Sequence, residues 1–560
     1  MQRRSKYQIA IRREEFNKWE RRVTLTPKNC KRLLFLLNGD LTIKVQPSES
    51  RVFSNKQFKE AGCIIDEDIT DCDIILGVKQ VPLKQLFPGK TYIFFSHVIK
   101  AQEDNMPMLD DILSKKIRLI DYEKIADKNG RLVAFGEYAG NAGMIDILSG
   151  LGSFLLNKGI GSPFINISQS YCYLNIDNAK NAIRIATACI ETQGLSHQIT
   201  PFIVGVTSMG RASKGARSIL ELLPHEYINP EEVEELCARA KENPENYNKS
   251  IFIVVFTQKH MVKRNNSEEP FDKSQYYKNP ELYTNIFQKT YLHHLSLLVN
   301  CMYWDFKYPR IVTSKYVRDY VVKEKKELRL LGISDVTCDY MGSIEFLKHF
   351  TTIDNPFFIY NPEDDSISHD YKSAKSGILY NSIENMPTQF PFDASTHFGN
   401  KLLPFMVDII KSNFNAPLAK QGLPVEIEDA VIAYDGKLAD KFTYITKLRD
   451  HKQRFKDKKV EPADMLNVLN KGKEAFDVEF EGHLFDTKAI NNILDYLIDE
   501  EKVFASIVDW KMGFGEKKPT NCRIRIIKND RQEMILQKLQ DKLKNMDIVM
   551  NVHGNPISIG

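Results

Sequence analysis

Short apolar runs alternate with helix-like stretches along the N-terminal part of the chain, and this alternation constrains the fold more than any other feature. The apolar runs occupy residues 7–11, 41–45, 73–78, 91–95 and 117–120. Helical stretches separate them, for example at residues 53–61 and again up to residue 113. Buried strands joined by helices are typical of a parallel sheet that helices cover on both faces. The pattern therefore predicts an α/β fold.

The same pattern returns after a long apolar helix at residues 135–156. Strand-like runs follow at residues 201–207, 251–256 and 331–336. A charge-rich stretch, residues 449–459, predicts a solvated helix and linker. Beyond it, alternating strands at residues 475–480 and 521–527 and amphipathic helices at residues 486–500 and 532–546 predict a small C-terminal α+β module.

Size and composition exclude several classes of protein. With 560 residues the chain is too long for one core, and a chain of this length is expected to form about three or four domains. The net charge of +4 gives no reason to expect a nucleic-acid partner. The nine cysteines have no metal-binding spacing, which predicts free thiols in a reducing compartment and no metal site. No apolar run approaches the roughly 20 residues of a membrane span. The first strand already begins near Tyr7, so we expect neither a secretory signal nor a transit peptide.

A charged segment between the first strand and the first helix predicts a ligand site. The strand at residues 7–11 is followed by Arg21 and Arg22, and Thr26 with Pro27 opens a helix. Two guanidinium groups at the end of a strand would form a carboxylate clamp, because each planar fork can bind a carboxylate through two hydrogen bonds. The alternative is a solvated loop whose charges serve only solubility.

The segment after the strand at residues 201–207 resembles a dinucleotide-binding turn with defects. In the pattern G-x-G-x-x-G its positions are Ser208, Gly210 and Ser213, so that only the middle glycine remains. We expect Ser208 to make the turn with a negative φ, and the helix to run over residues 217–223. A strand-turn-helix corner without a ligand is the alternative.

The residue that would grip a ribose hydroxyl should end the next strand, about 20 residues further on. Asn229 stands there instead of an acid. Loss of the acid favours a 2′-phosphate, and therefore NADPH over NADH.

Several segments recur together in one known family. They are residues 19–22 (WERR), 75–79 (ILGVK), 91–97 (TYIFFSH), 99–102 (IKAQ), 119–123 (LIDYE) and 342–346 (GSIEF). Over residues 7–455 the chain resembles the lysine-ketoglutarate reductase half of α-aminoadipic semialdehyde synthase. It also resembles the wider group of lysine-forming saccharopine dehydrogenase and alanine dehydrogenase.

The resemblance implies two Rossmann-like lobes around a cleft, with a cofactor lobe inserted into a catalytic lobe. We expect a catalytic lobe at residues 1–140, the inserted lobe at 141–344 and a return to the first lobe at 345–455. A charged linker at 456–474 and the module at 475–560 would complete the chain. The module resembles the region that joins the two halves of the plant bifunctional enzyme.

The activity that the resemblance implies is reductive condensation of L-lysine with 2-oxoglutarate to saccharopine, with NADPH as the reductant. Lys79 and His97 match the family's catalytic pair, and proton transfer in this reaction needs two groups that titrate near neutrality. From the residues alone, a surface lysine and a helix-start histidine are the alternatives. Arg22, Lys100 and Glu123 match substrate positions.

On the cofactor side, the predicted contacts are Ser208, Met209, Gly210, Arg211, Ser213, Asp335 and Asp339. The chain departs from the family in this loop and at residues 257–260 (TQKH). A catalytically weakened relative that serves as a structural or binding subunit is therefore an alternative. Another is a dehydrogenase for a different amino acid. The resemblance further implies a separate saccharopine-oxidising enzyme, a possible homo-oligomer, and a mitochondrial or cytoplasmic location.

Overall fold

The computed structural model describes residues 6–128, 130–265, 269–305, 307–449, 474–482, 493, 496–497, 505–511, 520–527, 532–543 and 548–558. The chain divides into two compact units. The first contains Met1–Ile99 and Asp104–Phe442, and the second contains Lys100–Glu103 and Thr443–Gly560. The first unit holds two large sheets and is described first.

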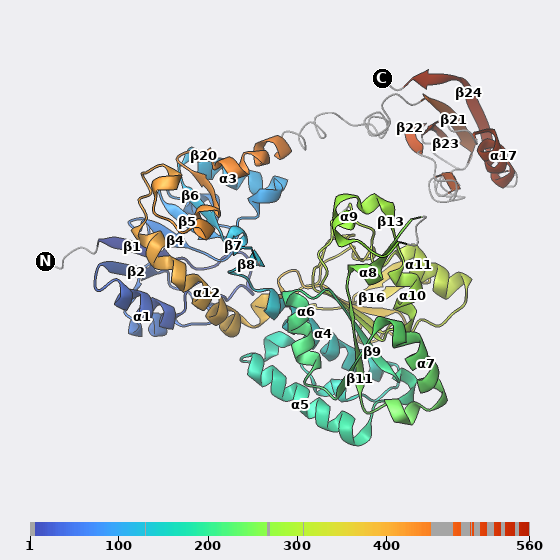
Figure 1. Ribbon diagram of the computed structural model, residues 1–560, viewed down its shortest axis with the longest axis horizontal. Helices are drawn as coiled ribbons and strands as arrows, with labels where there is room; N and C mark the ends of the chain where they lie inside the picture. The colour runs from blue at the N-terminus through green and yellow to red at the C-terminus, as the bar shows by residue number, and fades with distance from the viewer. Residues whose placement is uncertain are drawn as a thin grey trace. The chain divides into compact units, whose positions relative to one another are not determined.

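The first sheet has the strand order β20-β19-β6-β5-β4-β1-β2-β3. Its strands from β1 to β6 run parallel, and the hairpin β19–β20 closes one edge in antiparallel fashion. Helices α1 and α12 lie side by side against one face of this sheet (Figure 1). The bounds are β1 Tyr7–Ile11, β2 Leu41–Val45, β3 Ile64–Ile65, β4 Ile74–Leu76, β5 Thr91–Phe94, β6 Arg118–Asp121, β19 Val431–Tyr434, β20 Lys437–Leu438, α1 Pro27–Leu36 and α12 Pro391–Lys411.

The second sheet has the strand order β10-β11-β9-β14-β15-β18-β16-β17, and all its pairings are parallel except those of β16 with β18 and with β17. Helices α4, α5 and α6 cover one face and α7 covers the other (Figure 1). The predicted α/β fold class with two Rossmann-like lobes is confirmed. The bounds are β9 Phe202–Thr207, β10 His225–Ile228, β11 Ile251–Phe256, β14 Leu297–Asn300, β15 Gly332–Asp335, β16 Phe358–Asn361, β17 Ser366–Ser368, β18 Ile378–Asn381, α4 Gly136–Asn157, α5 Ile176–Gln193, α6 Arg211–Leu220 and α7 Val233–Glu242.

Shorter elements connect these layers. The helices are α2 Asn55–Glu60, α3 Met106–Ser114, α8 Gln258–Met261, α9 Lys273–Lys278, α10 Phe287–Thr290, α11 Ser314–Arg318 and α13 Val425–Glu428. Two small antiparallel pairs are β7 Ala126–Asp127 with β8 Gly130–Arg131, and β12 Val262–Arg264 with β13 Tyr283–Asn285.

The second lobe extends further along the chain than the boundary expected at residue 344. Strand β18 pairs with β15, and β16 pairs with β18, so residues up to Asn381 complete the second sheet. Residues 345–381 therefore do not yet return to the first lobe as expected, because the apolar strands β16 and β18 are almost wholly buried in the second sheet. The long helix α12, from Pro391, leads back to the first sheet.

Helix α4 is the one helix of the described residues that is long and apolar enough to cross a membrane, judged by length and composition alone. However, 78% of its most apolar window is buried inside the fold. It packs closely against α6, since a Cβ atom on Gly140 would lie 1.8 Å from the carbonyl oxygen of Ala212. The close approach of backbones requires glycine here and fixes the start of α6 beside the start of α4.

The second unit contains an antiparallel sheet with the order β22-β23-β21-β24 and the helix α17 (Figure 1). The strands predicted at residues 475–480 and 521–527 correspond to β21 Glu474–Gly482 and β23 Thr520–Ile527, and the last predicted helix is α17 Gln532–Leu543. Strands β22 Ala505–Lys511 and β24 Val549–Ser558 were not expected. The predicted linker and most of the helix at residues 486–500 lie outside the described residues.

Candidate functional site

The polar residues predicted for a substrate site converge at one edge of the first sheet. Lys79, His97 and Glu123 follow the carboxyl ends of the adjacent parallel strands β4, β5 and β6, and Arg22 lies in the loop after β1. All of these side chains line one cavity of about 630 Å³, which Arg211, Thr337 and Glu384 of the second lobe also line. Carboxyl ends of parallel strands are where α/β folds usually place ligands.

Hydrogen bonds fix the backbone at Lys79, whereas no ion pair within the described residues fixes its ammonium group. The buried carboxylate of Glu14 accepts hydrogen bonds from the N–H groups of Val78 and Lys79, at 2.7 and 3.0 Å. Within the ranges described, no carboxylate lies close enough to Nζ to form an ion pair, and Nζ lies 4.8 Å from the ring centre of Phe16. Burial, and then the charge of Arg22, lower the pKa of Lys79. A lysine in this environment can release its proton more easily than one in water.

Arg22 is buried and is already bound to a carboxylate of this chain. Its Nε and Nη2 donate to the two oxygens of Glu20 at 2.8 and 2.6 Å, and Nη2 also donates to Asn385 at 3.1 Å. The guanidinium stacks over the Phe135 ring at 4.2 Å. Although burial acts to raise the pKa of Glu20, its contacts with Arg22 lower it overall. Nη1 is therefore the nitrogen through which Arg22 could bind a ligand.

The predicted clamp of two neighbouring arginines is wrong. Arg21 is exposed and donates from Nε to the backbone carbonyl of Ser50 at 3.1 Å, whereas Arg22 is buried on the cavity side. Consecutive residues of an extended loop point to opposite sides, as in a strand, so the two guanidinium groups do not meet.

A buried carboxylate organises the other two site residues. Oδ2 of Asp121 accepts from the backbone N–H and the hydroxyl of Ser96, and Oδ1 accepts from the N–H of Glu123 at 2.8 Å. His97 follows Ser96 with a φ of +56°, and its Nδ1 lies 3.9 Å from Oε2 of Glu123, whose Oε1 pairs with Arg131. Burial raises the pKa of Asp121 to about 6. Sequence reasoning missed this residue, which is fully buried and outside the cavity lining.

We expect Asp121→Asn to lower turnover by about 10², because a misplacement of site groups by an ångström has an effect of that size. An amide would turn one N–H donor towards a donor of Ser96 or Glu123, and the loops that carry His97 and Glu123 would shift. Steady-state kinetics at several pH values measures this. The pH profile should keep its shape, since Asp121 moves no proton in the reaction.

Asp146→Asn is the matched control. Asp146 is also fully buried with a pKa raised by burial to about 6, and it accepts from Ser170 and Gln389 at 2.8 and 2.6 Å, away from the cavity lining. Equal losses of turnover in both variants would show that only general stability is affected.

The loop after β9 takes the backbone shape of a glycine-rich turn without its first glycine. Ser208 has a φ of +74°, which contradicts the expected negative φ, and its hydroxyl accepts from the N–H of Gly210 at 3.1 Å. This hydrogen bond offsets part of the strain of the left-handed conformation, which costs about 1–2 kcal/mol. Helix α6 begins at Arg211, six residues before the predicted start at 217, since Gly210 serves as its N-cap.

The predicted cofactor residues around this turn do not lie in one cavity. Arg211 stands at the first turn of α6 and lines the cavity with Lys79, whereas Ser208 lines a separate cavity of about 250 Å³. Met209 is exposed at the turn, with 61% of its surface accessible. Ser213 is fully buried inside α6, and its hydroxyl has no hydrogen-bond partner in the described part of the chain.

The order of strands corrects the position expected to meet a ribose. Strand β10, which precedes Asn229, is the outer edge of the sheet, and β11 is the neighbour of β9. The side chain of Asn229 forms a capping box with Glu232. The carboxyl end of β11 instead brings Gln258 beside Ser208, and both line the smaller cavity together with Met302 and Tyr303. The next residue, Lys259, is exposed.

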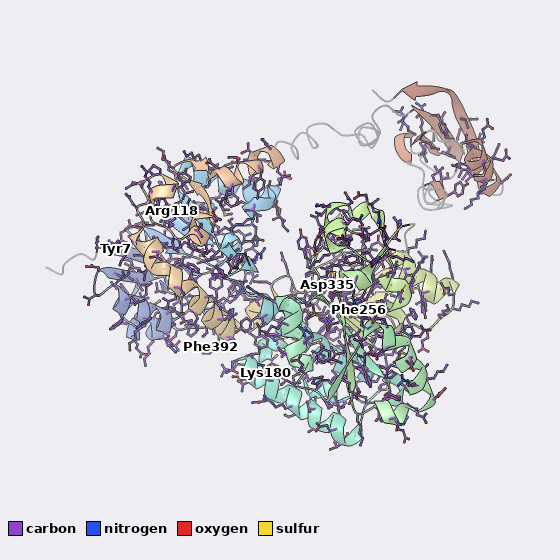
Figure 2. The ribbon with its side chains drawn as sticks, in the orientation of Figure 1. Tyr7, Arg118, Lys180, Phe256, Asp335 and Phe392 are labelled. Atoms are coloured by element: carbon purple, nitrogen blue, oxygen red, sulfur yellow. The ribbon has the colours of Figure 1, made fainter. Side chains whose placement is uncertain are left out.

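Three other predicted residues lie away from both cavities. Asp335, labelled in Figure 2, is fully buried, and its oxygens accept from Asn300, Thr337, Cys338 and Tyr380. Direct contact with a cofactor is therefore wrong for Asp335, which instead orders Thr337 at the cavity wall. Asp339 lies in a turn in which its carbonyl accepts from the N–H of Gly342. Lys100 ends the short helix Val98–Lys100 and is exposed.

Comparison with known proteins identifies relatives over most of the chain. Residues 10–142 match the family model "Alanine dehydrogenase/PNT, N-terminal domain", and residues 475–557 match the "LOR/SDH bifunctional enzyme conserved region". Alpha-aminoadipic semialdehyde synthase of Arabidopsis thaliana is 38% identical over 87% of this chain and 46% of its own length. The mitochondrial enzyme of that name from Mus musculus is 37% identical over 83% of this chain and 50% of its own length.

A more distant relative is the NAD(+), L-lysine-forming saccharopine dehydrogenase of Schizosaccharomyces pombe, which is 24% identical over 72% of this chain and 94% of its own length. The chain spans about half the length of the semialdehyde synthases that it matches. The predicted resemblance is confirmed: the chain is a homologue of α-aminoadipic semialdehyde synthase within the alanine dehydrogenase and saccharopine dehydrogenase superfamily.

Proposed function

We propose that the chain is a lysine-ketoglutarate reductase, which condenses L-lysine with 2-oxoglutarate and reduces the resulting imine to saccharopine. One observation carries the proposal. A lysine with a lowered pKa, a histidine and a buried arginine meet in the cavity that also receives the first turn of α6. A structural subunit has no need for such a set, and relatives over most of the chain are named as semialdehyde synthases.

Each of these side chains has a role in the proposed reaction. Lys79 acts as the base that keeps the attacking ε-amine neutral, because its own charged form is disfavoured by burial. His97 delivers the proton to the departing hydroxyl of the addition intermediate. Arg22 offers Nη1 to a carboxylate of 2-oxoglutarate. Glu123, near His97 at 3.9 Å, orients the imidazole or accepts from the lysine substrate.

The second lobe fits a nicotinamide dinucleotide as the hydride donor. Its turn at Ser208–Arg211 leaves the first N–H groups of α6 open at the cavity edge, where the positive end of the helix favours a pyrophosphate. Gln258 and the residues around it would hold the adenosine portion in the smaller cavity. Residues 257–260 contain no acid to repel a 2′-phosphate and include Lys259, which supports NADPH as the cofactor.

We expect Lys259→Ala to raise the KM for NADPH about tenfold and to leave the KM for NADH unchanged. The lost interaction would be a hydrogen bond to a charged phosphate, which is worth about 1.5–3 kcal/mol. Initial rates with both cofactors measure the effect. Lys263→Ala, an exposed lysine on β12, is the control. An equal loss with both cofactors would remove Lys259 as the residue that distinguishes them.

Substrate identity is tested by comparing amine substrates. Purified protein should oxidise NADPH only when L-lysine and 2-oxoglutarate are both present, and replacing lysine by ornithine or alanine should reduce the rate sharply. Turnover with ammonia and a keto acid in place of lysine would favour a dehydrogenase for another amino acid.

Three further assignments stay proposals. Residues 475–557 match the conserved region of the LOR/SDH bifunctional enzymes, and we propose that this module corresponds to the region that joins their two halves. Residues up to about 449 form the reductase, with the second sheet as its cofactor lobe. Mammalian relatives are named as mitochondrial, and we propose that compartment for this chain.

A further inference from the structure

A second polar cavity lies at the opposite ends of the strands that carry the proposed active site. Tyr7, Thr91 and Arg118 begin β1, β5 and β6, and they line a cavity of about 750 Å³ with the loop at residues 412–417. Figure 2 labels Tyr7 and Arg118 in the first lobe. No part of the proposed reaction uses this cavity.

Arg118 gives the cavity a buried positive charge without a negative partner. Its side chain is among the largest that are fully buried, with only 1% of the residue exposed. Nε donates to the Thr91 hydroxyl at 3.1 Å and Nη1 to the Gln421 side-chain oxygen at 2.8 Å, while the guanidinium lies 5.2 Å from the Phe414 ring centre. Every one of these partners is neutral, and no carboxylate of the described residues lies within ion-pair distance.

Burial of this kind is costly to the fold. It lowers the pKa of Arg118 to about 10, and no charged group of the protein contributes to that shift. An unpaired buried charge destabilises a fold unless an opposite charge compensates it. The loops at this position nevertheless enclose a guanidinium group and not an apolar side chain.

Gln421 shows that the surroundings are arranged for this charge. Its amide nitrogen donates to the carbonyl oxygens of Phe414 and Ala416, at 3.4 and 3.0 Å. The side-chain oxygen is thereby turned towards Arg118, and two of the guanidinium nitrogens are fixed. Nη2 has no protein partner in the described chain and is the nitrogen left for a ligand.

A second buried arginine makes the contrast clear. Arg51 also has a pKa lowered by burial to about 10, but its Nε, Nη1 and Nη2 all donate, to Phe53, Gln46 and Asn55. Arg51 lines none of the cavities described above. In Arg118, by contrast, only Nε and Nη1 have hydrogen-bond partners among the described residues. Arg118 also lines a cavity.

The other charged groups of the cavity lie at its rim. Lys116 and Lys437 are exposed lining residues, and so are Asp73 and Asp435, of which Asp73 lies 3.9 Å from Lys90. Counting Arg118, the lining holds three cations and two carboxylates. The two lysines and two carboxylates at the rim balance, so the net positive charge of the lining is that of Arg118 at the buried end.

We infer that this cavity binds a small oxyanion, a carboxylate or a phosphate, with Nη2 of Arg118 as the buried anchor and Lys116 and Lys437 at the entrance. The two N–H groups of Nη2 and the charge of the guanidinium suit both kinds of anion, since a carboxylate and a phosphate each present negatively charged oxygens that accept hydrogen bonds. Strand β6 joins the two sites directly, because Arg118 begins it and Asp121, which positions His97 and Glu123, ends it.

Thermal unfolding of the full chain tests the inference. Inorganic phosphate and acetate are titrated separately at constant ionic strength against chloride. We expect one of them to raise the melting temperature of the wild type in a saturable way by about 2 °C or more. Arg118→Gln should abolish this shift. Arg51→Gln should lower the melting temperature but keep the shift.

Two further variants separate this site from the proposed active site and from misfolding. Lys79→Met should keep the shift, whatever its effect on turnover, so failure of the proposed reaction leaves this test intact. If Arg118→Gln does not fold, Arg118→Lys, which keeps the charge but loses the planar fork, should weaken the anion's half-saturation at least tenfold. An unchanged shift in the Arg118 variant, or no saturable shift with either anion in the wild type, would overturn the inference.

Discussion

Replacing Lys79 by methionine should lower turnover by about 10²–10⁴, the usual contribution of a positioned general base. Methionine keeps the length and apolar stem of lysine, so the packing beside Phe16 should survive. The N–H groups that Glu14 holds belong to the backbone and are unaffected. Steady-state rates of NADPH oxidation with saturating lysine and 2-oxoglutarate measure the loss.

The pH dependence separates a lost base from a lost fold. Wild-type kcat/KM should rise with pH and level off above the pKa of Lys79, which lies below its ordinary value. That rising limb should be absent in Lys79→Met. Lys84→Met, an exposed lysine of the next turn, serves as the control and should behave as wild type. A variant at Lys79 with near-normal turnover would show that another group is the base.

Arg22→Met should destabilise the protein by about 3–5 kcal/mol, the usual result of removing one partner of a buried ion pair. Glu20 would remain with no exposed side-chain surface and with three neutral donors among the described residues: the Asn385 amide, the Thr388 hydroxyl and the backbone N–H of residue 22. Chemical unfolding followed by fluorescence measures the free-energy difference. The same variant should lose affinity for 2-oxoglutarate, if Nη1 binds its carboxylate.

The double variant Glu20→Gln/Arg22→Met is the control for the buried charge, and we expect it to regain most of the lost stability. The effect of pH has a definite sign. In the wild type the pKa of Glu20 is lowered, so the pair's contribution is present above its unfolded pKa and is lost as the pH falls through the folded value. In Arg22→Met burial would raise that pKa, and acid would neutralise the stranded charge. The stability gap should therefore narrow on acidification, and a gap that widens would contradict the account.

The location of the site could be predicted from the sequence because strand ends are a local property. Apolar runs ending just before Lys79 and His97 mark carboxyl ends, and in a parallel sheet such ends share one edge. The structure places Lys79, His97, Glu123 and Arg22 around one cavity, as this reasoning expects.

The residues that hold the site in place could not be predicted in this way. Glu14 and Glu20 belong to a run of charges that looks like a solvated loop, yet both are buried by contacts made in the fold. The Asn385 amide that bonds both Glu20 and Arg22 comes from the other end of the first unit. A signal existed for Asp121, since a carboxylate at the end of an apolar strand has to be satisfied by nearby N–H groups.

The order of strands in the second sheet is a tertiary property, so the strand next to β9 could not be predicted from its place in the chain. Strand β10 follows β9 in the chain, but its exposed residues suit an edge, and the more apolar β11 takes the buried place beside β9. The residues that follow β11, Gln258 and Lys259, include no acid, so the proposal of NADPH keeps the same physical basis at this strand.

The central claim is tested most directly by identifying the product made from lysine labelled with ¹⁵N at the ε-position. The account predicts one product that contains the label and the carbon skeletons of both lysine and 2-oxoglutarate, formed in a ratio of one to the NADPH consumed. Folded protein that consumes no NADPH with both substrates present, or a product without the ε-nitrogen, would contradict it.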